Sequence, residues 1–316
     1  MAPSARYPHV FIPLAISHPM TETVVVTGGL GRSGRWICDR LAEDYRVVCV
    51  DLDHPGWEIA PRDRIDFRAV DVTDGSEVRE IVSECDPDAV VHWAALPSPE
   101  RHAGSRVFET NVEGTYTVLD AAGRAGADIV WASSESAYGL AFVDETPLPA
   151  YLPMDEDHPK APEDPYGTSK VAGEEVAKMV ARRDGVQVAS IRSSWIQYPG
   201  EYNCRDVAAG DMAGGAGNCW SYVDVRDVAG IVAAALDVEF DGHEAFHAAA
   251  AENYVGRPTA DLVEEFWGEV PARCELAGEQ SALSTAKADG LLDWTPEHGW
   301  REAADEDIDE PSLLAE

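Results

Sequence analysis

The chain has 316 residues, 45% of them hydrophobic, and its 58 acidic against 24 basic residues give a formal net charge of −34. A nucleic-acid binder needs a basic surface to neutralise phosphates, so this charge argues against nucleic-acid partners and against an anionic membrane surface. The sequence has no apolar run of about 18 residues, so we expect no membrane-spanning helix.

The acidity comes with a shortage of lysine, because only four of the 24 basic residues are Lys. One interpretation is simply a very soluble acidic protein. We favour a halophilic, cytoplasmic protein of a salt-rich cell, where dissolved ions screen the repulsion between surface carboxylates. The six cysteines are far apart and form no C-x-x-C pair or Cys/His cluster, so we expect reduced thiols and no metal site.

The first segment, residues 1–19, is expected to be a disordered extension. Its short apolar stretch is interrupted by Pro13, and no small-residue cleavage site follows, so it does not resemble a signal peptide. Met20 stands directly before a strand-like run, which suggests that translation starts there and that the first 19 residues come from an upstream start codon.

From residue 22 to 192, short apolar runs alternate with segments of helical periodicity. Strands are predicted at 23–27, 46–51, 65–70, 89–93, 128–132 and 186–192. Helices are predicted at 33–43, 76–84, 107–124 and 166–183, with Ser76 as the cap of the second helix. This alternation predicts an α/β fold with a doubly wound parallel sheet.

The rhythm changes after residue 192. We predict a loop over 201–217, a helix over 225–236, a further strand over 245–249 and a helix over 258–267. The acidic tail that begins at residue 301 is expected to be mobile. The predicted organisation is an extension (1–19), a doubly wound domain (20–192), a smaller substrate-binding region (193–300) partly interleaved with the sheet, and the tail (301–316).

The turn between the first strand and the first helix contains Gly28, Gly31 and Gly34. Glycine lets a pyrophosphate approach the backbone, and the helix N-terminus offers free N–H groups, so the turn predicts a dinucleotide site. The alternative is a glycine-rich turn without a ligand. Asp51 ends the second strand, where an acid accepts hydrogen bonds from ribose hydroxyls and repels a 2′-phosphate. It favours NAD over NADP, unless it is only a solvated loop acid.

Tyr166 and Lys170 occur as Tyr-Gly-Thr-Ser-Lys at the start of a predicted helix, and their i, i+4 spacing places both on one face. A nearby ammonium lowers the pKa of a phenol, which makes tyrosine a usable base, and the same Lys can hold a nicotinamide ribose. Ser133 and Ser134 end the fifth strand, at the edge of the sheet where ligands bind. By itself, Tyr-x-x-x-Lys is more often a solvated helix face. Here the pair indicates a catalytic site because it follows a glycine turn, a strand-end acid and a strand-end Ser in that order.

This order of motifs resembles that of the extended short-chain dehydrogenases/reductases, in the family of NAD-dependent epimerases and dehydratases. The resemblance covers about residues 22–300 and implies a Rossmann fold with bound NAD. The matching stretches are residues 27–34, 71–72, 92–95, 111–115, 133–139, 166–170 and 222–228.

The resemblance also implies residue roles. Tyr166 would be the acid/base with Lys170 as its partner, Ser134 would bind the reacting oxygen, and Asn111 would support the site. Without the family pattern, Asp71 is equally a loop acid and Asn111 a helix-start residue. The expected NAD-binding residues are Gly28, Leu30, Gly31, Arg32, Ser33, Gly34, Asp51, Asp71, Val72, Ala94, Ala95, Tyr166, Lys170 and Ser193. The expected substrate contacts are Ser134, Ser136, Trp195 and Arg205.

The sequence departs from the nucleotide-sugar members after the sixth strand. Trp195 stands where those members have an Asn, and only about thirty residues separate Arg192 from Tyr222, which is short for a nucleotide-gripping insert. A smaller pocket and a free sugar are implied. Arg205 lies at nearly the offset where uronate dehydrogenases place an Arg on the substrate carboxylate, although a surface Arg paired with one of many acids is at least as good an interpretation.

Three functions remain open. The preferred hypothesis is an NAD-dependent oxidoreductase that acts on a free sugar or sugar acid. The alternative is a nucleotide-sugar epimerase or dehydratase with tightly bound NAD, which would release no net NADH. A non-catalytic cofactor sensor ranks last, because such proteins tend to lose the Tyr–Lys pair. The helices at 107–124 and 166–183 resemble the pair through which this family commonly dimerises, so a homodimer is expected.

Overall fold

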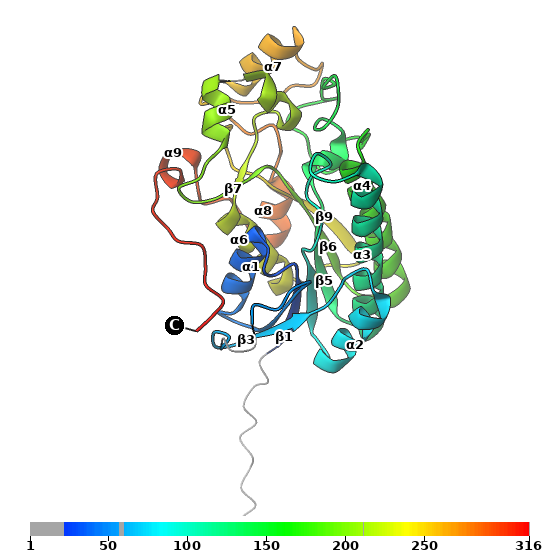
Figure 1. Cartoon of the computed structure of the whole chain (residues 1–316). Coiled ribbons are helices and arrows are strands. Elements are labelled where there is room, and N and C mark those ends of the chain that lie inside the picture. Colours follow the sequence, from blue (N-terminus) through cyan, green and yellow to red (C-terminus); the bar gives the residue numbers. More distant parts are fainter. Residues whose placement is uncertain (1–21, 57–59, 211, 316) are drawn as a thin grey trace, which may run out of the picture.

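A parallel sheet forms the centre of the chain in a computed structural model, which describes residues 22–56, 60–210 and 212–315 (Figure 1). Its order, β3-β2-β1-β4-β5-β6-β9, reverses between β1 and β4, and every neighbouring pair is parallel. The predicted doubly wound α/β fold is therefore confirmed. Its strands are β1 (Thr23–Thr27), β2 (Arg46–Asp51), β3 (Ile65–Ala69), β4 (Ala89–His92), β5 (Asp128–Ala132), β6 (Val188–Ser193) and β9 (His243–Ala248). The expected extension at residues 1–19 lies outside the described residues.

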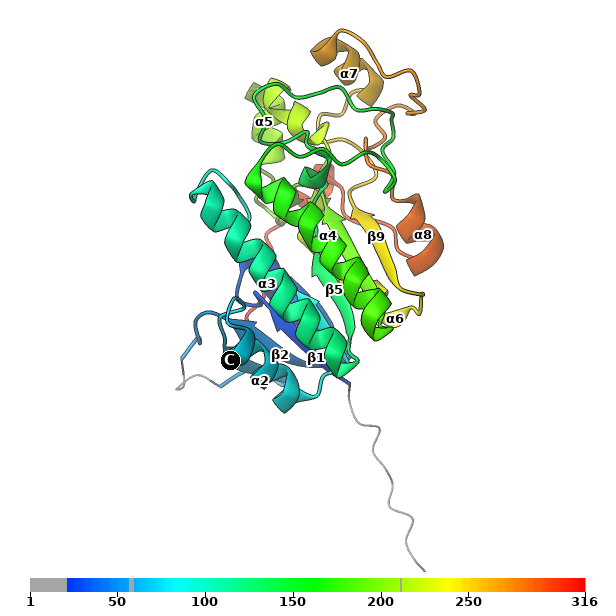
Figure 2. The ribbon, with the colours of Figure 1, turned by 90° about the vertical axis from the view of Figure 1, so that its right-hand side faces the viewer.

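Helices cover both faces of this sheet (Figures 1 and 2). One face carries α1 (Arg32–Leu41), α6 (Val225–Asp237) and α8 (Ala286–Leu292). The other carries α2 (Gly75–Cys85), α3 (Gly104–Ala125) and α4 (Pro165–Asp184), with α3 and α4 side by side in Figure 2. None of these helices, nor any other among the described residues, is long and apolar enough to cross a bilayer.

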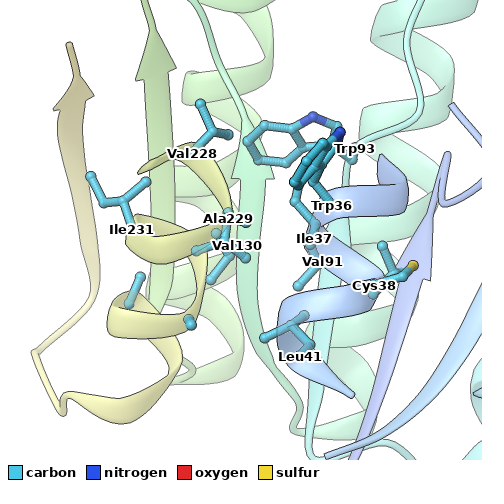
Figure 3. Packing of buried hydrophobic residues seen from close by; sticks show 14 of the residues in the cluster. Trp36, Ile37, Cys38, Leu41, Val91, Trp93, Val130, Val228, Ala229 and Ile231 are labelled. Carbon is cyan, nitrogen blue, oxygen red and sulfur yellow. The ribbon is translucent and has the colours of Figure 1, made fainter. Parts of the chain in front are cut away.

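The core follows from the alternation of side chains along each strand. Val24 and Val26 point toward α1 and join one apolar cluster, whereas Val25 between them joins the cluster under α2, α3 and α4. Figure 3 shows the first cluster, where Ile37 and Leu41 of α1 pack toward α6. Because both faces are covered, β1, β2, β4 and β5 are nearly continuous apolar runs, whereas the edge strand β3 alternates.

The region beyond β6 adds one more strand to the sheet and builds most of a cap over its carboxyl end. β9 adds the last strand and α6 packs on the sheet. The other elements are η1 (Glu135–Tyr138), β7 (Ile196–Gln197), α5 (Cys204–Gly210), η2 (Met212–Asn218), β8 (Val223–Asp224), α7 (Thr259–Trp267) and α9 (Trp300–Ala303). The cap has its own apolar cluster, with Trp220, Tyr222 and Tyr254 fully buried.

Three local predictions were wrong. The segment 201–217 is not a loop, because it contains α5 and most of η2. Its small residues hide helical periodicity, and packing stabilises it: a Cβ on Gly215 would lie 2.3 Å from the Trp220 ring. The cap of α2 is Asp74, whose carboxylate accepts the N–H groups of Ser76 and Glu77, so Ser76 lies inside the helix.

The third wrong prediction is that the acidic tail is mobile. The tail is packed against the rest of the protein. Leu313 is 1% exposed and joins the cluster under α1. Its carbonyl accepts the N–H of Arg62, and Leu314 forms a β-bridge with Pro61 beside β3. Ala303 and Ala304 are also buried, in the cluster of the cap, so apolar contacts at both ends of this acidic segment fix its path across the surface.

Candidate active site

A cavity of about 1080 Å³ opens at the carboxyl ends of β1, β4, β5 and β6, under the cap. It lies where the sheet order reverses, so that the chain leaves β1 and β4 in opposite directions. Fifteen of the predicted site residues line it: Gly28, Gly31, Arg32, Ser33, Asp51, Asp71, Val72, Ala94, Ala95, Ser134, Ser136, Tyr166, Lys170, Ser193 and Trp195.

The glycine turn forms one end of the cavity. Gly28 has φ +70°, and a Cβ there would lie 2.6 Å from the backbone N of Ala94. A Cβ on Gly34 would lie 2.0 Å from the carbonyl oxygen of Gly28, so this glycine closes the turn against the helix. No side chain caps α1 at Gly31, which leaves the first N–H groups of the helix free for an anionic group.

Asp51 shapes the same end of the cavity. Its Oδ2 accepts the N–H of Leu30 at 3.0 Å, and its Oδ1 accepts the N–H of Leu52 at 2.8 Å. The carboxylate thus fixes the glycine turn and still has lone pairs left for ribose hydroxyls. Asp71 and Val72, which follow β3, line the same end of the cavity.

The reacting end of the cavity gathers Ser134, Tyr166 and Lys170. Asp164 caps α4 by accepting the N–H groups of Tyr166 and Gly167 at 2.8 and 2.9 Å, which fixes the phenol at the start of the helix. One turn later, the Nζ of Lys170 lies 5.3 Å from the centre of the Tyr166 ring. Ser134 accepts the N–H of Ser136 at 3.1 Å and hydrogen-bonds to the phenol of Tyr166.

The pKa of the Tyr166 phenol moves opposite to the prediction. Burial raises it to about 12, and the hydrogen bond with Ser134 only partly offsets this effect. Lys170 does not lower it, because burial lowers the pKa of Lys170 itself to about 7, and its ammonium group is hydrogen-bonded to the carbonyl of Ala132. Burial thus disfavours each charge alone, whereas a phenolate and an ammonium formed together compensate each other.

Four predicted site residues lie outside the cavity lining: Leu30, Gly34, Asn111 and Arg205. Asn111 is buried in α3, where its amide bonds both the N–H and the carbonyl of Leu96, and also Ser169 of α4. It therefore positions the loop after β4 rather than contacting a ligand. Arg205 is 44% exposed and pairs with Asp305 at 2.8 Å, which matches the alternative of a surface ion pair.

Several wall residues were missed because loops without periodicity supply them. Phe142, Thr146 and Asn218 come from the segments after η1 and at the end of η2. Glu135 was also missed, although an acid directly after the strand-end serines was visible in the sequence. Trp93, directly after β4, donates a hydrogen bond to the hydroxyl of Ser33 at 3.0 Å. This bond links the loop after β4 to the first turn of α1.

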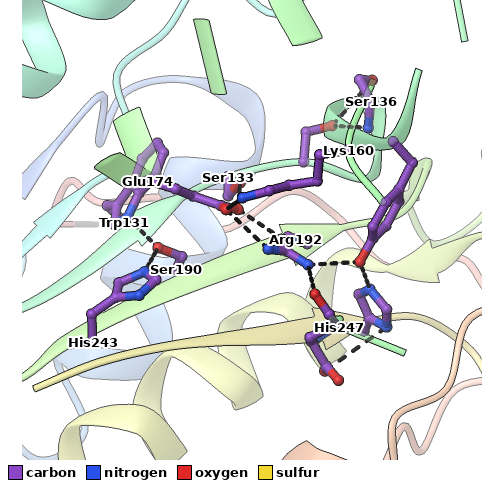
Figure 4. A network of polar contacts seen from close by, with 12 residues as sticks. Trp131, Ser133, Ser136, Lys160, Glu174, Ser190, Arg192, His243 and His247 are labelled. Carbon is purple, nitrogen blue, oxygen red and sulfur yellow. Dashed lines mark hydrogen bonds and ion pairs between the residues drawn. The ribbon is translucent and has the colours of Figure 1, made fainter. Parts of the chain in front are cut away.

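A buried polar network supports the reacting end from behind (Figure 4). Glu174 of α4 is fully buried and accepts two hydrogen bonds from Arg192 of β6, at 2.7 and 2.9 Å. It also accepts the hydroxyl of Ser133 at 2.9 Å and pairs with Lys160. The network fixes the ends of β5 and β6 relative to α4, and so fixes Ser134 relative to Tyr166.

The residues fit a dinucleotide. The cavity is elongated enough to run from the glycine turn to Tyr166, and the turn leaves room only for glycine. The buried hydroxyl of Ser193 has no hydrogen-bond partner in the protein and lies in the cavity wall, as expected of a group that awaits a ligand. No cluster of three or more potential metal ligands occurs among the described residues.

Comparisons with known proteins agree with this geometry. The model of the NAD dependent epimerase/dehydratase family matches residues 24–249. An L-arabinose 1-dehydrogenase (NAD(P)(+)) of Haloferax volcanii is 32% identical over 179 residues, 55% of this chain and 66% of that protein. A UDP-glucose 4-epimerase of Rhizobium leguminosarum is 34% identical over 187 residues, 56% of this chain and 51% of that protein. The matches thus span about half to two thirds of these relatives.

The fold is also that of the Bordetella bronchiseptica enzyme WbmG, solved in complex with NAD. The TM-score is 0.66 at 21% identity, over 92% of this chain and 94% of that one. At this identity the likeness supports the architecture alone.

Proposed function

Because the chain belongs to the NAD-dependent epimerase/dehydratase family, we propose that it is an NAD-dependent oxidoreductase acting on a hydroxyl group of a free sugar. The observation that carries the proposal is one continuous cavity, which joins the glycine turn and Asp51 at one end to Ser134, Tyr166 and Lys170 at the other. Such a cavity can hold a dinucleotide and a small polyol in contact.

In the proposed reaction, bound NAD supplies the acceptor for the hydride. The residues of this chain accept the proton of the sugar hydroxyl and bind its oxygen. Tyr166 takes the proton of the sugar hydroxyl, and the hydroxyl of Ser134 hydrogen-bonds to the same oxygen. The Lys170 ammonium, one helical turn away, compensates the charge of the phenolate. The network around Glu174 holds Ser134 and Tyr166 in place while these protons move.

The charge of the cavity supports a free sugar over a nucleotide-linked one. Among the described wall residues the cations are Arg32 and Lys170. Arg32 lies at the glycine turn, and Lys170 lies beside Tyr166. A nucleotide diphosphate carries further negative charges, which such sites neutralise with arginine or lysine. Arg205, the cation predicted for the substrate side, is paired with Asp305 outside the wall.

A nucleotide-sugar epimerase or dehydratase is the second candidate, and the match to UDP-glucose 4-epimerase supports it. The test is a panel of aldoses, uronates and UDP-sugars with NAD in molar KCl, followed by NADH absorbance. A dehydrogenase releases NADH in proportion to the sugar consumed. Conversion of a UDP-sugar without net NADH would favour the epimerase instead, and tight NAD binding without turnover of any carbohydrate would reject both.

The Tyr166→Phe variant tests the catalytic assignment. It should lose at least about a hundredfold in turnover, since general-base catalysis contributes about that much, and should keep its affinity for NAD. Tyr151→Phe, at a tyrosine outside the cavity wall, is the control. Turnover that survives Tyr166→Phe would remove this residue from the mechanism.

We also propose that the protein is cytoplasmic and halophilic. With a net charge of −34, the melting temperature should rise steadily as KCl is increased, because ions screen the repulsion between carboxylates. A melting temperature independent of KCl would contradict this.

The proposed homodimer uses α3 and α4. Phe108 and Tyr116 are about two turns apart on α3 and are 38% and 47% exposed, so they offer two large side chains that a second copy could cover. Light scattering should give twice the mass of the 34.2 kDa chain, and Phe108→Asp with Tyr116→Asp should give the monomer. A monomeric wild type would refute the interface.

A further inference from the structure

We propose that Glu135 selects the substrate: its carboxylate accepts hydrogen bonds from the hydroxyls of a neutral sugar and discriminates against sugars that carry a carboxylate. The inference rests on the proposed function and names the substrate class of that site. It narrows the expected substrates from free sugars and sugar acids to sugars without an acid group.

Glu135 lies at the reacting end of the cavity. It directly follows Ser134, begins η1 and lines the cavity together with Ser136 and Tyr166. The hydroxyl of Ser194, just beyond β6, donates to its Oε2 at 2.9 Å, and the backbone N–H of Trp195 donates to the same carboxylate. A carboxylate can accept about four hydrogen bonds, so capacity remains for the hydroxyls of a ligand.

No Lys, Arg or His of the described part of the chain forms an ion pair with this carboxylate. Burial raises the pKa of Glu135 well above its usual value, and the groups that oppose this are the hydroxyl of Ser194 and the N–H of Trp195. The charge of Glu135 raises the pKa of Tyr166, Cys219 and Tyr254, none of which is a cation. The negative charge is therefore stabilised only by hydrogen bonds, those from Ser194 and Trp195 and those that the hydroxyls of a ligand add.

The two cations of the described wall are engaged elsewhere. Arg32 pairs with Glu201 and stacks on Tyr198 with its guanidinium carbon 3.7 Å from the ring centre. Lys170 donates to the carbonyl of Ala132 at 2.8 Å. A sugar carboxylate beside Glu135 would therefore meet another carboxylate without a counter-charge, and two carboxylates in one site cannot both stay ionised. A neutral polyol meets no such penalty and gains charge-assisted hydrogen bonds.

A purely structural role is the competing explanation, in which Glu135 only joins the end of β5 to the end of β6 through Ser194. The two roles separate experimentally. Glu135→Gln keeps the size of the side chain and one acceptor oxygen, and it removes the charge. Ser194→Ala removes the link between the strands, and it removes only one of the two donors that stabilise the Glu135 charge.

The experiment compares kcat/KM for three substrates in the holoenzyme. They are the aldose oxidised best in the panel, the uronic acid of the same ring stereochemistry, and the methyl ester of that acid, which has its bulk without its charge. The wild type should prefer the aldose and the ester to the acid by about tenfold or more, as expected for one lost charged hydrogen bond. In Glu135→Gln this preference should fall by about tenfold, with the ester unaffected relative to the aldose.

Two further variants serve as controls for this experiment. Glu100→Gln, at an exposed carboxylate in the same wall, should keep the wild-type preference against the acid, and Ser194→Ala should lose less of this preference than Glu135→Gln does. An unchanged preference in Glu135→Gln overturns the proposal. So does a wild type that oxidises the acid as well as its ester, a result that needs no variant to fold. Absence of NADH from every carbohydrate would instead be a failure of the proposed function.

Discussion

The Nζ atom of Lys170 lies 2.8 Å from the carbonyl oxygen of Ala132, the last residue of β5. The side chain is 3% exposed, and burial lowers its pKa to about 7. The fold thus holds a lysine, at a cost in stability, at the place where the reaction needs a cation.

Lys170→Met should abolish turnover and make the protein more stable at neutral pH. Between pH about 7 and 10.5 the unfolded chain binds a proton at Lys170 that the native protein does not, so the native state gains stability as pH rises through this window. The variant should therefore be more stable by on the order of 2–4 kcal/mol at about pH 7, and this advantage should shrink toward pH 10. Urea unfolding at both pH values measures it. Lys178→Met, at an exposed position of the same helix, is the control, and an advantage of equal size at both pH values would contradict the argument.

Asp51→Asn should weaken NAD binding by about tenfold, because it removes the charge offered to the ribose and one of the acceptors that fix the glycine turn. The affinity for NADP should rise relative to that for NAD, since the repulsion of a 2′-phosphate disappears. Fluorescence titration of both cofactors measures the two affinities. Asp53→Asn, two residues on, should change neither, and an unaltered NAD affinity in Asp51→Asn would place the ribose elsewhere.

Glu174→Gln should destabilise the protein by about 3 kcal/mol at neutral pH, because it leaves the buried guanidinium of Arg192 without its partner. Burial alone would raise the pKa of Glu174, but Arg192 and Lys160 lower it to about 2. The carboxylate therefore stabilises the native state above pH 4.5, and this contribution is lost as pH falls from 4.5 toward 2. The deficit of the variant should shrink in acid. Glu175→Gln, at the exposed neighbour, should have little effect, and a deficit that grows in acid would be the contrary result.

Leu313→Ala tests the docking of the acidic tail. The side chain is 1% exposed in the cluster under α1, so its truncation should lower the free energy of unfolding by about 2–4 kcal/mol. Leu314→Ala, at the half-buried neighbour, should have a smaller effect. Equal effects at the two positions, measured by urea unfolding, would mean that the tail is not held by Leu313.

The sequence alone determined the alternation of strands and helices and the order of the motifs along it. Apolar runs, helical periodicity and a glycine turn are local patterns, and parallel strands bring their carboxyl ends to one edge wherever the intervening helices pack. The order of the motifs, together with the family resemblance, was therefore enough to predict that Asp51, Ser134 and Tyr166 would meet around one cavity, and the structure places all three in its wall.

Only the tertiary structure decided which charges act there. Burial, not spacing, sets the pKa of Tyr166 and Lys170, and the path of the tail sets the partner of Arg205 as Asp305. Likewise, Gly215 packs in a helix because Trp220 occupies the space beside it, and Glu135 stands in the wall without a cation because Arg32 and Lys170 are engaged elsewhere. Desolvation and contacts between residues distant in the chain produce these features, and neither leaves a local pattern in the sequence.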